Sequence, residues 1–474
     1  MTSTSLRSCL LLVGFVGILG LCNFTFCGQD WNANISSLCL DIFFFLSLVY
    51  SADLLVQSSA IDIPANFSKE WFTALFREKG AIGYSNSIQS VDNEKKLTGG
   101  CHSFVRRVDL NFQEKLESPN LPKSVVIKIL AWDTSLLSKL NLHIRSLLPV
   151  RFETKDVNYL KSYDIESKFY GQVAPEIRGI KLPRVYYNVG DKFNNKFGMI
   201  MEDISNQQSL PVSTGQPLGF DSTETSIILQ RLASFHSWFW DHPDLNRYTI
   251  WDYGGYYTAD KRIQFKNQVR SHWETVIKTF TQQGIMDFDE KLTSLGSRLY
   301  DNREALYSMY SKSAATTLVH GDFKISNLFV NQTRHSSPRS RNYNQNNHES
   351  SVYVIDWQWV GKGSPALDLS YYLATSISAD LLNFSNLEKY VLYYHSILSS
   401  NGVQNYPYDR MWREFRLCFV DFIVYVICCK WSSMGLKEFA SNQEGLKDGL
   451  HIRSLNHVKA LVLLVDQFLD SLQS

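Results

Sequence analysis

Short apolar runs separated by polar stretches characterise residues 61–203 of this 474-residue chain. The runs VVIKIL (125–130) and FGMIMEDI (197–204) have the length and the apolar content of strands. Apolar and polar residues alternate from 104 to 112, directly after a glycine pair, and this pattern is typical of a hairpin. We therefore predict that this region is rich in strands.

Helical spacing of apolar residues dominates residues 204–474, as in SIILQRLASFHSWFWD (226–241). One further helix is predicted inside the strand-rich region, at 157–170. The stretch RLCFVDFIVYVICCKW (416–431) is apolar for most of its length, and Asp421 interrupts it. We expect a buried helix there and not a membrane span. The pattern thus predicts an α+β protein with a mainly helical second part.

Two segments of the second part carry the candidate chemistry. LVHGDFKISNLFV sets His320, Asp322 and Asn327 in an H-x-D-x-x-x-x-N frame, and VYVIDWQWV sets Asp356 at the end of an apolar run. Phosphoryl transfer from ATP needs one carboxylate to orient the attacking hydroxyl, and an amide oxygen and a second carboxylate to hold Mg²⁺. Apolar runs on both sides predict neighbouring strands or loops that bring these side chains together. The alternative is a buried histidine and a capping aspartate in an ordinary turn.

The strand-rich region supplies candidates for the other half of a nucleotide site. Gly99 and Gly100 lie at the predicted hairpin turn, where glycine lets backbone N–H groups approach a phosphate. Lys128 lies inside an apolar strand and must find an anion, unless it is an edge-strand lysine that keeps the edge soluble. Glu166 on the predicted helix is the best partner for Lys128, and Glu153 is a weaker one.

A connector between the two parts follows the strand FGMIMEDI. It ends in Glu202 and Asp203, and we expect this connector to offer backbone groups to adenine. In GSPALDLSYYLA, Ser364 is predicted to cap a helix with Pro365 at its first position. Asp368 then lies in the first turn of that helix, where we expect it to brace the catalytic loop.

The order of these motifs resembles the aminoglycoside phosphotransferase and choline kinase-like superfamily, nearest the ecdysteroid kinase-like group, over roughly residues 65–470. The segments that carry the resemblance are VVIKIL, ESKFY, MIMEDI, LVHGDFKISN, VIDWQW and GSPALDLSYYLA. The resemblance implies a protein-kinase-like two-lobed fold, with a small β-rich N-lobe at 61–203 and a larger, mainly helical C-lobe at 204–474.

The resemblance also implies roles for single residues. Asp322 corresponds to the catalytic base or orienter, and Asn327 and Asp356 correspond to the metal ligands. Lys128 corresponds to the lysine that contacts the α- and β-phosphates, and Glu166 to its partner. The implied cofactors are ATP and Mg²⁺.

Two features depart from the pattern of the group. Residues 331–351, NQTRHSSPRSRNYNQNNHESS, stand where a tight connection between two strands is usual. This tract is polar and lacks a hydrophobic period, so we predict a disordered surface insertion. Lys324 follows Asp322 by two residues, where protein kinases carry a lysine that reaches the transferred phosphate. Its alternative is a solvent-facing lysine on the loop.

Charge and composition narrow the classes of function. The 47 lysines and arginines nearly balance the 46 aspartates and glutamates, which argues against a nucleic-acid-binding surface. None of the eight cysteines has a spacing that suits zinc. Eleven tryptophans are present, and most are expected in the core, although a minority could line an acceptor pocket.

The beginning of the chain allows two interpretations. Within residues 1–60, an apolar core at 9–22 follows Arg7, which suits a signal peptide and is short for a spanning helix. If residues 6–27 are a signal segment, the protein enters the secretory pathway or is tethered to it by an anchor. Otherwise the segment is an extension and the enzyme is cytoplasmic. Membrane contact is expected only through residues 1–50.

The sequence as a whole predicts an ATP- and Mg²⁺-dependent phosphotransferase that acts on a hydroxyl of a small molecule. The alternatives are an atypical protein kinase, a catalytically inactive nucleotide-binding protein, and an interaction protein that keeps only the fold. Gly321 stands where most protein kinases have arginine, and DWQ replaces DFG, which argues against the first. The acceptor stays open among sterol-like alcohols, amino alcohols and sugars, and the oligomeric state stays open too.

Overall fold

The computed structural model describes residues 67–97, 103–113, 121–130, 155–191, 196–206, 219–245, 259–308, 317–331, 351–433 and 455–473. The chain divides into two units, Met1–Asp62 and Ile63–Ser474. The first unit lies outside the described residues, and so do the predictions of a signal peptide, anchor or extension. The second unit contains the sheet, the helices and the candidate site.

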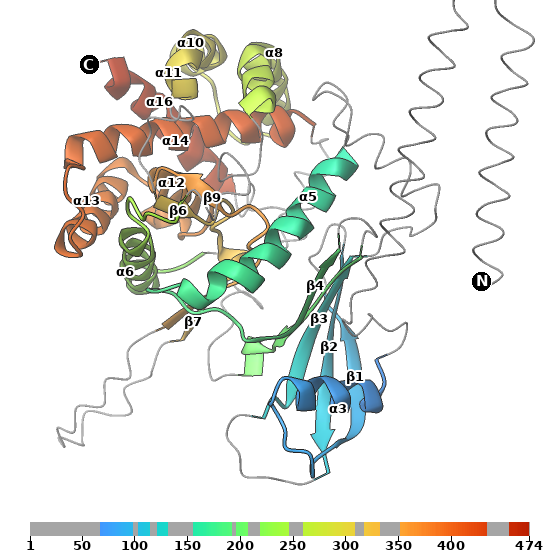
Figure 1. Ribbon diagram of the computed structural model, residues 1–474. Coiled ribbons are helices and arrows are strands. Elements are labelled where there is room, and N and C mark those ends of the chain that lie inside the picture. Colours follow the sequence, from blue (N-terminus) through green and yellow to red (C-terminus); the bar gives the residue numbers. More distant parts are fainter. Residues whose placement is uncertain are drawn as a thin grey trace, which may run out of the picture. The chain divides into compact units, whose positions relative to one another are not determined.

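Five antiparallel strands form one sheet in the order β1-β2-β3-β5-β4 (Figure 1). The strands are β1 Ile88–Lys96, β2 Ser103–Phe112, β3 Ser124–Leu130, β4 Val185–Asp191 and β5 Lys196–Glu202. The predicted strands at 104–112, 125–130 and 197–204 are therefore confirmed, and β1 and β2 pair as the predicted hairpin.

Strand β3 lies at the centre of the sheet. Lys128 is paired with Val105 of β2 on one side and with Met199 of β5 on the other. The alternative that Lys128 protects a strand edge is therefore wrong, because both edges of β3 carry neighbours. A lysine at the centre of a sheet needs an anion within reach of its side chain.

Two helices accompany the sheet. Helix α3 (Lys69–Glu78) begins after Ser68, whose hydroxyl accepts a hydrogen bond from the backbone N–H of Trp71, and Phe76 of α3 packs on Tyr186 of β4. Helix α5 (Lys155–Lys168) confirms the helix predicted at 157–170. It continues into one π-helical turn, η2 (Phe169–Val173), and a 3₁₀ turn, η3 (Ala174–Glu176).

Helices make up most of the described residues after the sheet. The structure has α6 Ser222–Trp238, α8 Ala259–Gln282, α9 Glu290–Thr293, α10 Leu295–Asp301, α11 Arg303–Ser308, α12 Ala366–Thr375, α13 Phe384–Ser400, α14 Tyr408–Cys429 and α16 Leu455–Gln473. Short 3₁₀ turns are η4 Ile204–Asn206, η5 Ile325–Asn327, η6 Ala379–Leu381 and η7 Trp431–Ser433. Side chains from α6, α8, α12, α13, α14 and α16 share one hydrophobic core. The predicted α+β architecture is confirmed.

Helix α14 contains residues 416–429 of the apolar stretch and is a buried helix, as predicted. Asp421, which interrupts that stretch, forms an ion pair at 2.9 Å with Lys266 of α8. Both side chains are buried, so each offsets the desolvation cost of the other. Across the described residues, no helix combines the length and the hydrophobicity that crossing a bilayer requires.

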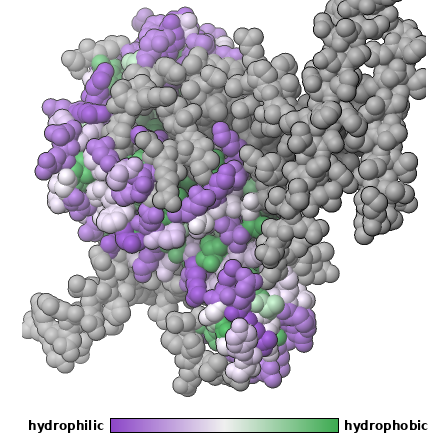
Figure 2. Space-filling model, viewed as in Figure 1, coloured by the Kyte–Doolittle hydropathy of each residue, from purple (hydrophilic) through white to green (hydrophobic). Residues whose placement is uncertain are grey.

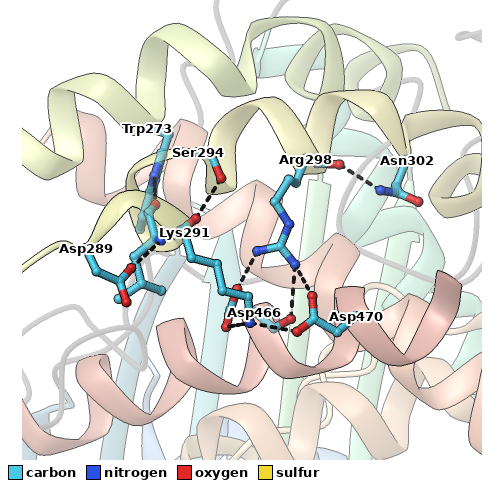
Figure 3. A network of polar contacts seen from close by, with 9 residues as sticks. Trp273, Asp289, Lys291, Ser294, Arg298, Asn302, Asp466 and Asp470 are labelled. Atoms are coloured by element: carbon cyan, nitrogen blue, oxygen red, sulfur yellow. Dashed lines mark hydrogen bonds and ion pairs between the residues drawn. The ribbon is translucent and has the colours of Figure 1, made fainter. Parts of the chain in front are cut away.

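The C-terminal helix α16 is tied to α9 and α10 by a network of ion pairs (Figure 3). Lys291 lies 2.7 Å from Asp466 and 2.6 Å from Asp470, and Arg298 bonds both carboxylates. Networks of this kind contribute more to stability than isolated surface pairs do.

On the face drawn in Figure 2, hydrophilic residues cover most of the coloured surface.

Two short pairs of antiparallel strands carry the candidate segments. Strand β6 (Thr317–Val319) pairs with β9 (Gly361–Gly363), and β7 (Leu328–Asn331) pairs with β8 (Ser351–Val354). The β7–β8 pairing confirms that the two segments predicted to carry Asn327 and Asp356 are neighbours. The insertion between these strands lies outside the described residues at 332–350.

The β7–β8 pairing predicts that the insertion is dispensable for folding. Deleting residues 334–349 leaves 332, 333 and 350 to join Asn331 and Ser351, which are already paired across the hairpin. Because loop closure costs less with fewer residues, the melting temperature should stay the same or rise slightly. Thermal melting of the deletion variant tests this. A fall of more than about 5 °C would show that the insertion stabilises the fold.

Candidate active site

The loop after β6 holds its histidine in one orientation. Gly321 has a φ of +80°, a left-handed conformation that glycine adopts without strain. The buried His320 accepts a hydrogen bond at Nδ1 from the backbone N–H of Asp322 (3.1 Å), and its Nε2 lies 3.0 Å from the carbonyl oxygen of Ile355. Because a backbone N–H only donates and a carbonyl only accepts, the proton of this imidazole is on Nε2. His320 therefore connects the loop to the segment before Asp356.

Asp368 braces this loop, as predicted. Its two carboxylate oxygens accept hydrogen bonds from the backbone N–H groups of His320 (2.6 Å) and Gly321 (2.8 Å). Helix α12 begins at Ala366, one residue later than expected, and Pro365 is its N-cap. The Ser364 hydroxyl nevertheless accepts from the Ala366 N–H at 3.3 Å, so it caps the helix end by the predicted hydrogen bond.

His236 is a core residue and not a candidate ligand. Its Nε2 lies 3.2 Å from Asp368 Oδ2, its Nδ1 bonds the hydroxyl of Tyr394, and the side chain is fully buried. The backbone carbonyl of His236 accepts a hydrogen bond from Thr317 of β6 at 2.7 Å. Helix α6 therefore supports the same strand and carboxylate that position the loop.

Asp322, Lys324 and Asn327 lie in direct contact. Lys324 Nζ is 2.8 Å from Asp322 Oδ2, and the Asn327 amide donates to the same oxygen at 3.1 Å and to the Asp322 carbonyl at 2.9 Å. Within the described residues, the other carboxylate oxygen of Asp322, Oδ1, is buried and has no hydrogen-bond partner. One oxygen of Asp322 is thus held in place while the second is available to accept a proton.

Asp356 lies directly beside this group. The backbone N–H of Ile355 donates to the Asn327 carbonyl at 3.0 Å. Asn327 precedes β7 and Asp356 follows β8, so the two predicted metal ligands lie at the same end of the β7–β8 hairpin. Asp356 has a φ of +66°, a left-handed conformation that is uncommon for residues other than glycine and is frequent at functional sites. The predicted convergence of the two segments is confirmed.

Lys128 joins the sheet to this segment. Its ammonium lies 2.9 and 2.7 Å from the two oxygens of Glu166 and 2.9 Å from Asp356 Oδ1. Glu166 is therefore the partner of Lys128, whereas Glu153 lies outside the described residues. Burial disfavours the ammonium, but the two carboxylates outweigh it and raise the pKa of Lys128. Burial also opposes ionisation of Asp356, and the Lys128 charge outweighs this and lowers the pKa of Asp356.

Stacked aromatic rings pack next to Asp356, and the sequence analysis did not predict this contact. Trp357 lies parallel to Phe169 of the π-helical turn, with ring centres 4.2 Å apart, and meets His320 edge-on at 4.6 Å. Tyr170 follows Phe169, and within the described residues its buried hydroxyl has no hydrogen-bond partner. Burial and the negative charge of Glu166 raise the pKa of Tyr170 well above its usual value.

Hydrogen bonds from neighbouring protein groups hold the side chain of Asp203. Its carboxylate accepts hydrogen bonds from Arg107 Nε (2.6 Å), the Ser124 hydroxyl (2.7 Å) and the Ser205 N–H (3.0 Å). Burial raises the pKa of Asp203, but hydrogen bonds from Ser205, Ser124 and Arg107 outweigh it and lower the pKa below its ordinary value. The side chain of Asp203 therefore ties the end of β5 to β2 and β3.

The other residues predicted to contact the nucleotide are Glu202, Gly99 and Gly100. Glu202 donates its backbone N–H to the Arg184 carbonyl at 2.7 Å, and its side chain accepts from the Arg184 N–H at 3.1 Å. A role for the Glu202–Asp203 backbone toward adenine stays a prediction. Gly99 and Gly100 lie outside the described residues.

A comparison of the sequence with known families agrees with this geometry. The sequence model of the ecdysteroid kinase-like family matches residues 102–403, which is more than half of the chain. The protein therefore belongs to the ecdysteroid kinase-like family, and the predicted kinase-like fold is confirmed. No curated protein matches the chain.

Solved structures that match this chain include several small-molecule kinases. An ethanolamine kinase from Plasmodium vivax is 12% identical, with a TM-score of 0.39, and the match covers 88% of this chain and 93% of that one. An aminoglycoside phosphotransferase from Alicyclobacillus acidocaldarius is 11% identical, with a TM-score of 0.35 and coverages of 88% and 97%. A choline kinase from Streptococcus pneumoniae is 12% identical, with a TM-score of 0.32 and coverages of 83% and 99%. At these TM-scores the family match carries the assignment.

Because Lys128 pairs with both Glu166 and Asp356, we predict that replacing it strongly lowers the stability of the protein. Lys128→Met leaves Glu166 and Asp356 as neighbouring carboxylates without their cation, and this should cost about 3 kcal/mol of unfolding free energy at pH 7. We take the lower end of the usual range because 26% of the Asp356 side chain is exposed. Urea denaturation measures the loss. The double variant Lys128→Met/Glu166→Gln is the control and should recover part of it.

The difference in stability between the wild type and Lys128→Met should depend on pH. Because the pKa of Asp356 is lowered in the folded protein, its stabilising contribution is present above about pH 4 and is lost as the pH falls through that lowered value. The difference in stability between the wild type and Lys128→Met should therefore shrink below about pH 4. An equal difference at acidic and neutral pH would contradict the ion-pair assignment.

Proposed function

We propose that this protein is an ATP- and Mg²⁺-dependent phosphotransferase whose acceptor is a hydroxyl group of a small molecule. The observation that carries the proposal is the position of Lys128. It bonds Glu166 of the sheet-side helix and Asp356 of the catalytic segment at once, beside the Asp322 loop. A cation fixed between those two carboxylates is placed to bind phosphate oxygens close to a metal ligand.

The donor groups fit Mg²⁺ bound together with a nucleotide. Mg²⁺ in phosphoryl-transfer sites is usually held by one or two protein oxygens, substrate phosphates and waters. Asp356 supplies a carboxylate and Asn327 an amide oxygen, since the Asn327 nitrogen faces Asp322. In the described part of the chain, no three His, Cys, Asp or Glu side chains form a metal cluster. A site completed by the phosphates of ATP agrees with both observations.

The protein side of the transfer step follows from the state of Asp322. Its Oδ2 is held by Lys324 and Asn327, and its buried Oδ1 is not bonded to any described group. Oδ1 can therefore accept a hydrogen bond from an acceptor hydroxyl and take its proton as the new O–P bond forms and the bond from the γ-phosphorus to the oxygen that leaves with ADP breaks. Lys324 balances the charge of the carboxylate, and its ammonium is close enough to the reacting groups to bind the transferred phosphate.

Ligand binding and product identification test the proposal together. Mg-ATP should raise the melting temperature of the wild type, since a ligand that binds only the folded state stabilises it. ATP consumption should then be screened over amino alcohols, sugars and sterol-like alcohols, with identification of the phosphorylated product by mass. A melting temperature that Mg-ATP leaves unchanged would indicate an interaction protein, and binding without turnover of any alcohol would indicate an inactive module.

Replacing the proposed base should abolish most turnover and spare folding. Asp322→Asn keeps the size of the side chain and removes the proton acceptor, so kcat should fall by about 10²–10⁴-fold. Mg-ATP binding, followed by calorimetry, should stay close to that of the wild type. A variant with kcat within about threefold of the wild type would remove Asp322 from this role.

Replacing the proposed metal ligand should act on binding. Asp356→Asn suits the left-handed backbone at this position, because asparagine tolerates a positive φ, and it removes the negative charge. Affinity for Mg-ATP should fall by at least about tenfold, whereas affinity for ATP with EDTA should change little. Isothermal titration of both forms measures this. Equal affinities of wild type and variant for Mg-ATP would refute the assignment.

A further inference from the structure

Helix α5 contacts strand β4 one residue beyond Glu166. The Ser167 hydroxyl donates to Asn188 Oδ1 at 3.0 Å, and the Asn188 amide donates back to the Ser167 carbonyl at 2.7 Å. The carbonyl of Ser167 lies where the α-helix gives way to the π-helical turn η2, which shifts the backbone ladder from i+4 to i+5. The side chain of Asn188 thus bonds the helix at the place where its own ladder changes.

Gly190 makes this close approach possible. A Cβ atom at position 190 would lie 2.2 Å from Ser167 Oγ and 2.7 Å from Ser167 Cβ, closer than real atoms approach. The backbone of Gly190 does not have a positive φ, so the requirement for glycine comes from Ser167 and not from the conformation of the strand. Helix and strand therefore touch here at a distance that a larger residue would prevent.

The contact borders a narrow pocket between α5 and strands β3, β4 and β5. Its lining residues include Lys128, Glu166, Ser167 and Asn188. Tyr163 of α5 also meets Phe197 of β5 in this lining, with ring centres 6.1 Å apart. The two hydrogen bonds and the contact with Gly190 tie α5 directly to β4 at the residue after Glu166.

We propose that Ser167, Asn188 and Gly190 form a lock that positions helix α5, and through it the Glu166 carboxylate, against Lys128. These three are positioning residues, because they act through Glu166. The lock keeps the lysine centred between Glu166 and Asp356. Its effect on turnover rests on the phosphotransferase function proposed above, whereas its effect on the helix does not.

A paired substitution tests the lock. Gly190→Ala adds the Cβ that collides with Ser167, and Gly190→Ala/Ser167→Gly removes the colliding atoms again. Gly83→Ala is the matched control, because its Cβ would meet no atom closer than 3.9 Å and its φ is not positive. Asn188→Ala removes the two hydrogen bonds without adding bulk, and it serves if Gly190→Ala fails to fold.

Hydrogen exchange of residues 161–168 and steady-state kinetics with Mg-ATP are the two readouts. Gly190→Ala should speed amide exchange in this part of α5 and lower kcat by about 10²-fold, with a smaller change in KM, because displaced charges act mainly on the transition state. The double variant should return kcat to within about tenfold of the wild type, the remaining loss reflecting glycine in a helix. Gly83→Ala should match the wild type in both.

Two results would overturn the lock. One is wild-type exchange and kcat in Gly190→Ala and Asn188→Ala. The other is a double variant that is no better than Gly190→Ala alone. If the wild type itself neither binds nor consumes Mg-ATP, the proposed function fails, and the exchange of α5 still decides the lock: faster exchange in Gly190→Ala that Ser167→Gly reverses supports it.

Discussion

The ion pairs of Lys128 are the interaction on which the site depends. A lysine at the centre of a sheet cannot stay charged without counter-charges, and Glu166 and Asp356 provide them from helix α5 and from the segment after β8. Lys128 and Asp356 are separated by 228 positions along the chain. One ammonium therefore links the sheet, helix α5 and the segment after β8. If any of the three moves away, a charge is left without its partner.

The rest of the site is built to keep that geometry. Asp368 satisfies the two backbone N–H groups of the His320–Gly321 turn, and His320 in turn bonds the carbonyl before Asp356. Buried backbone groups must find partners, so the loop can hold only the arrangement that these acceptors allow. The stack of Trp357 on Phe169 packs the segment after β8 against the π-helical turn. Hydrogen bonds to buried polar groups and the packing of aromatic rings thus fix the positions of the same few residues.

Much of the site was predictable because its signals are local. The H-x-D-x-x-x-x-N spacing, the aspartate at the end of an apolar strand and the lysine within VVIKIL each occupy a short stretch, and strand patterns on both sides predicted that the segments of Asn327 and Asp356 would meet. Family resemblance then supplied the roles. The ranges of the strands and helices followed from periodicity, which depends on neighbours two to four positions apart.

The sequence by itself determined the fold class, the strands that carry the site and the residues with the right chemistry. Only the tertiary structure decided that β3 is central, that Asp203 serves to tie β5 to two other strands, and that Gly190 lies against Ser167. The physical reason is the same in each case. A residue's chemistry and its local pattern are properties of short segments, whereas its partner is set by packing between segments far apart in the chain, which no local pattern encodes.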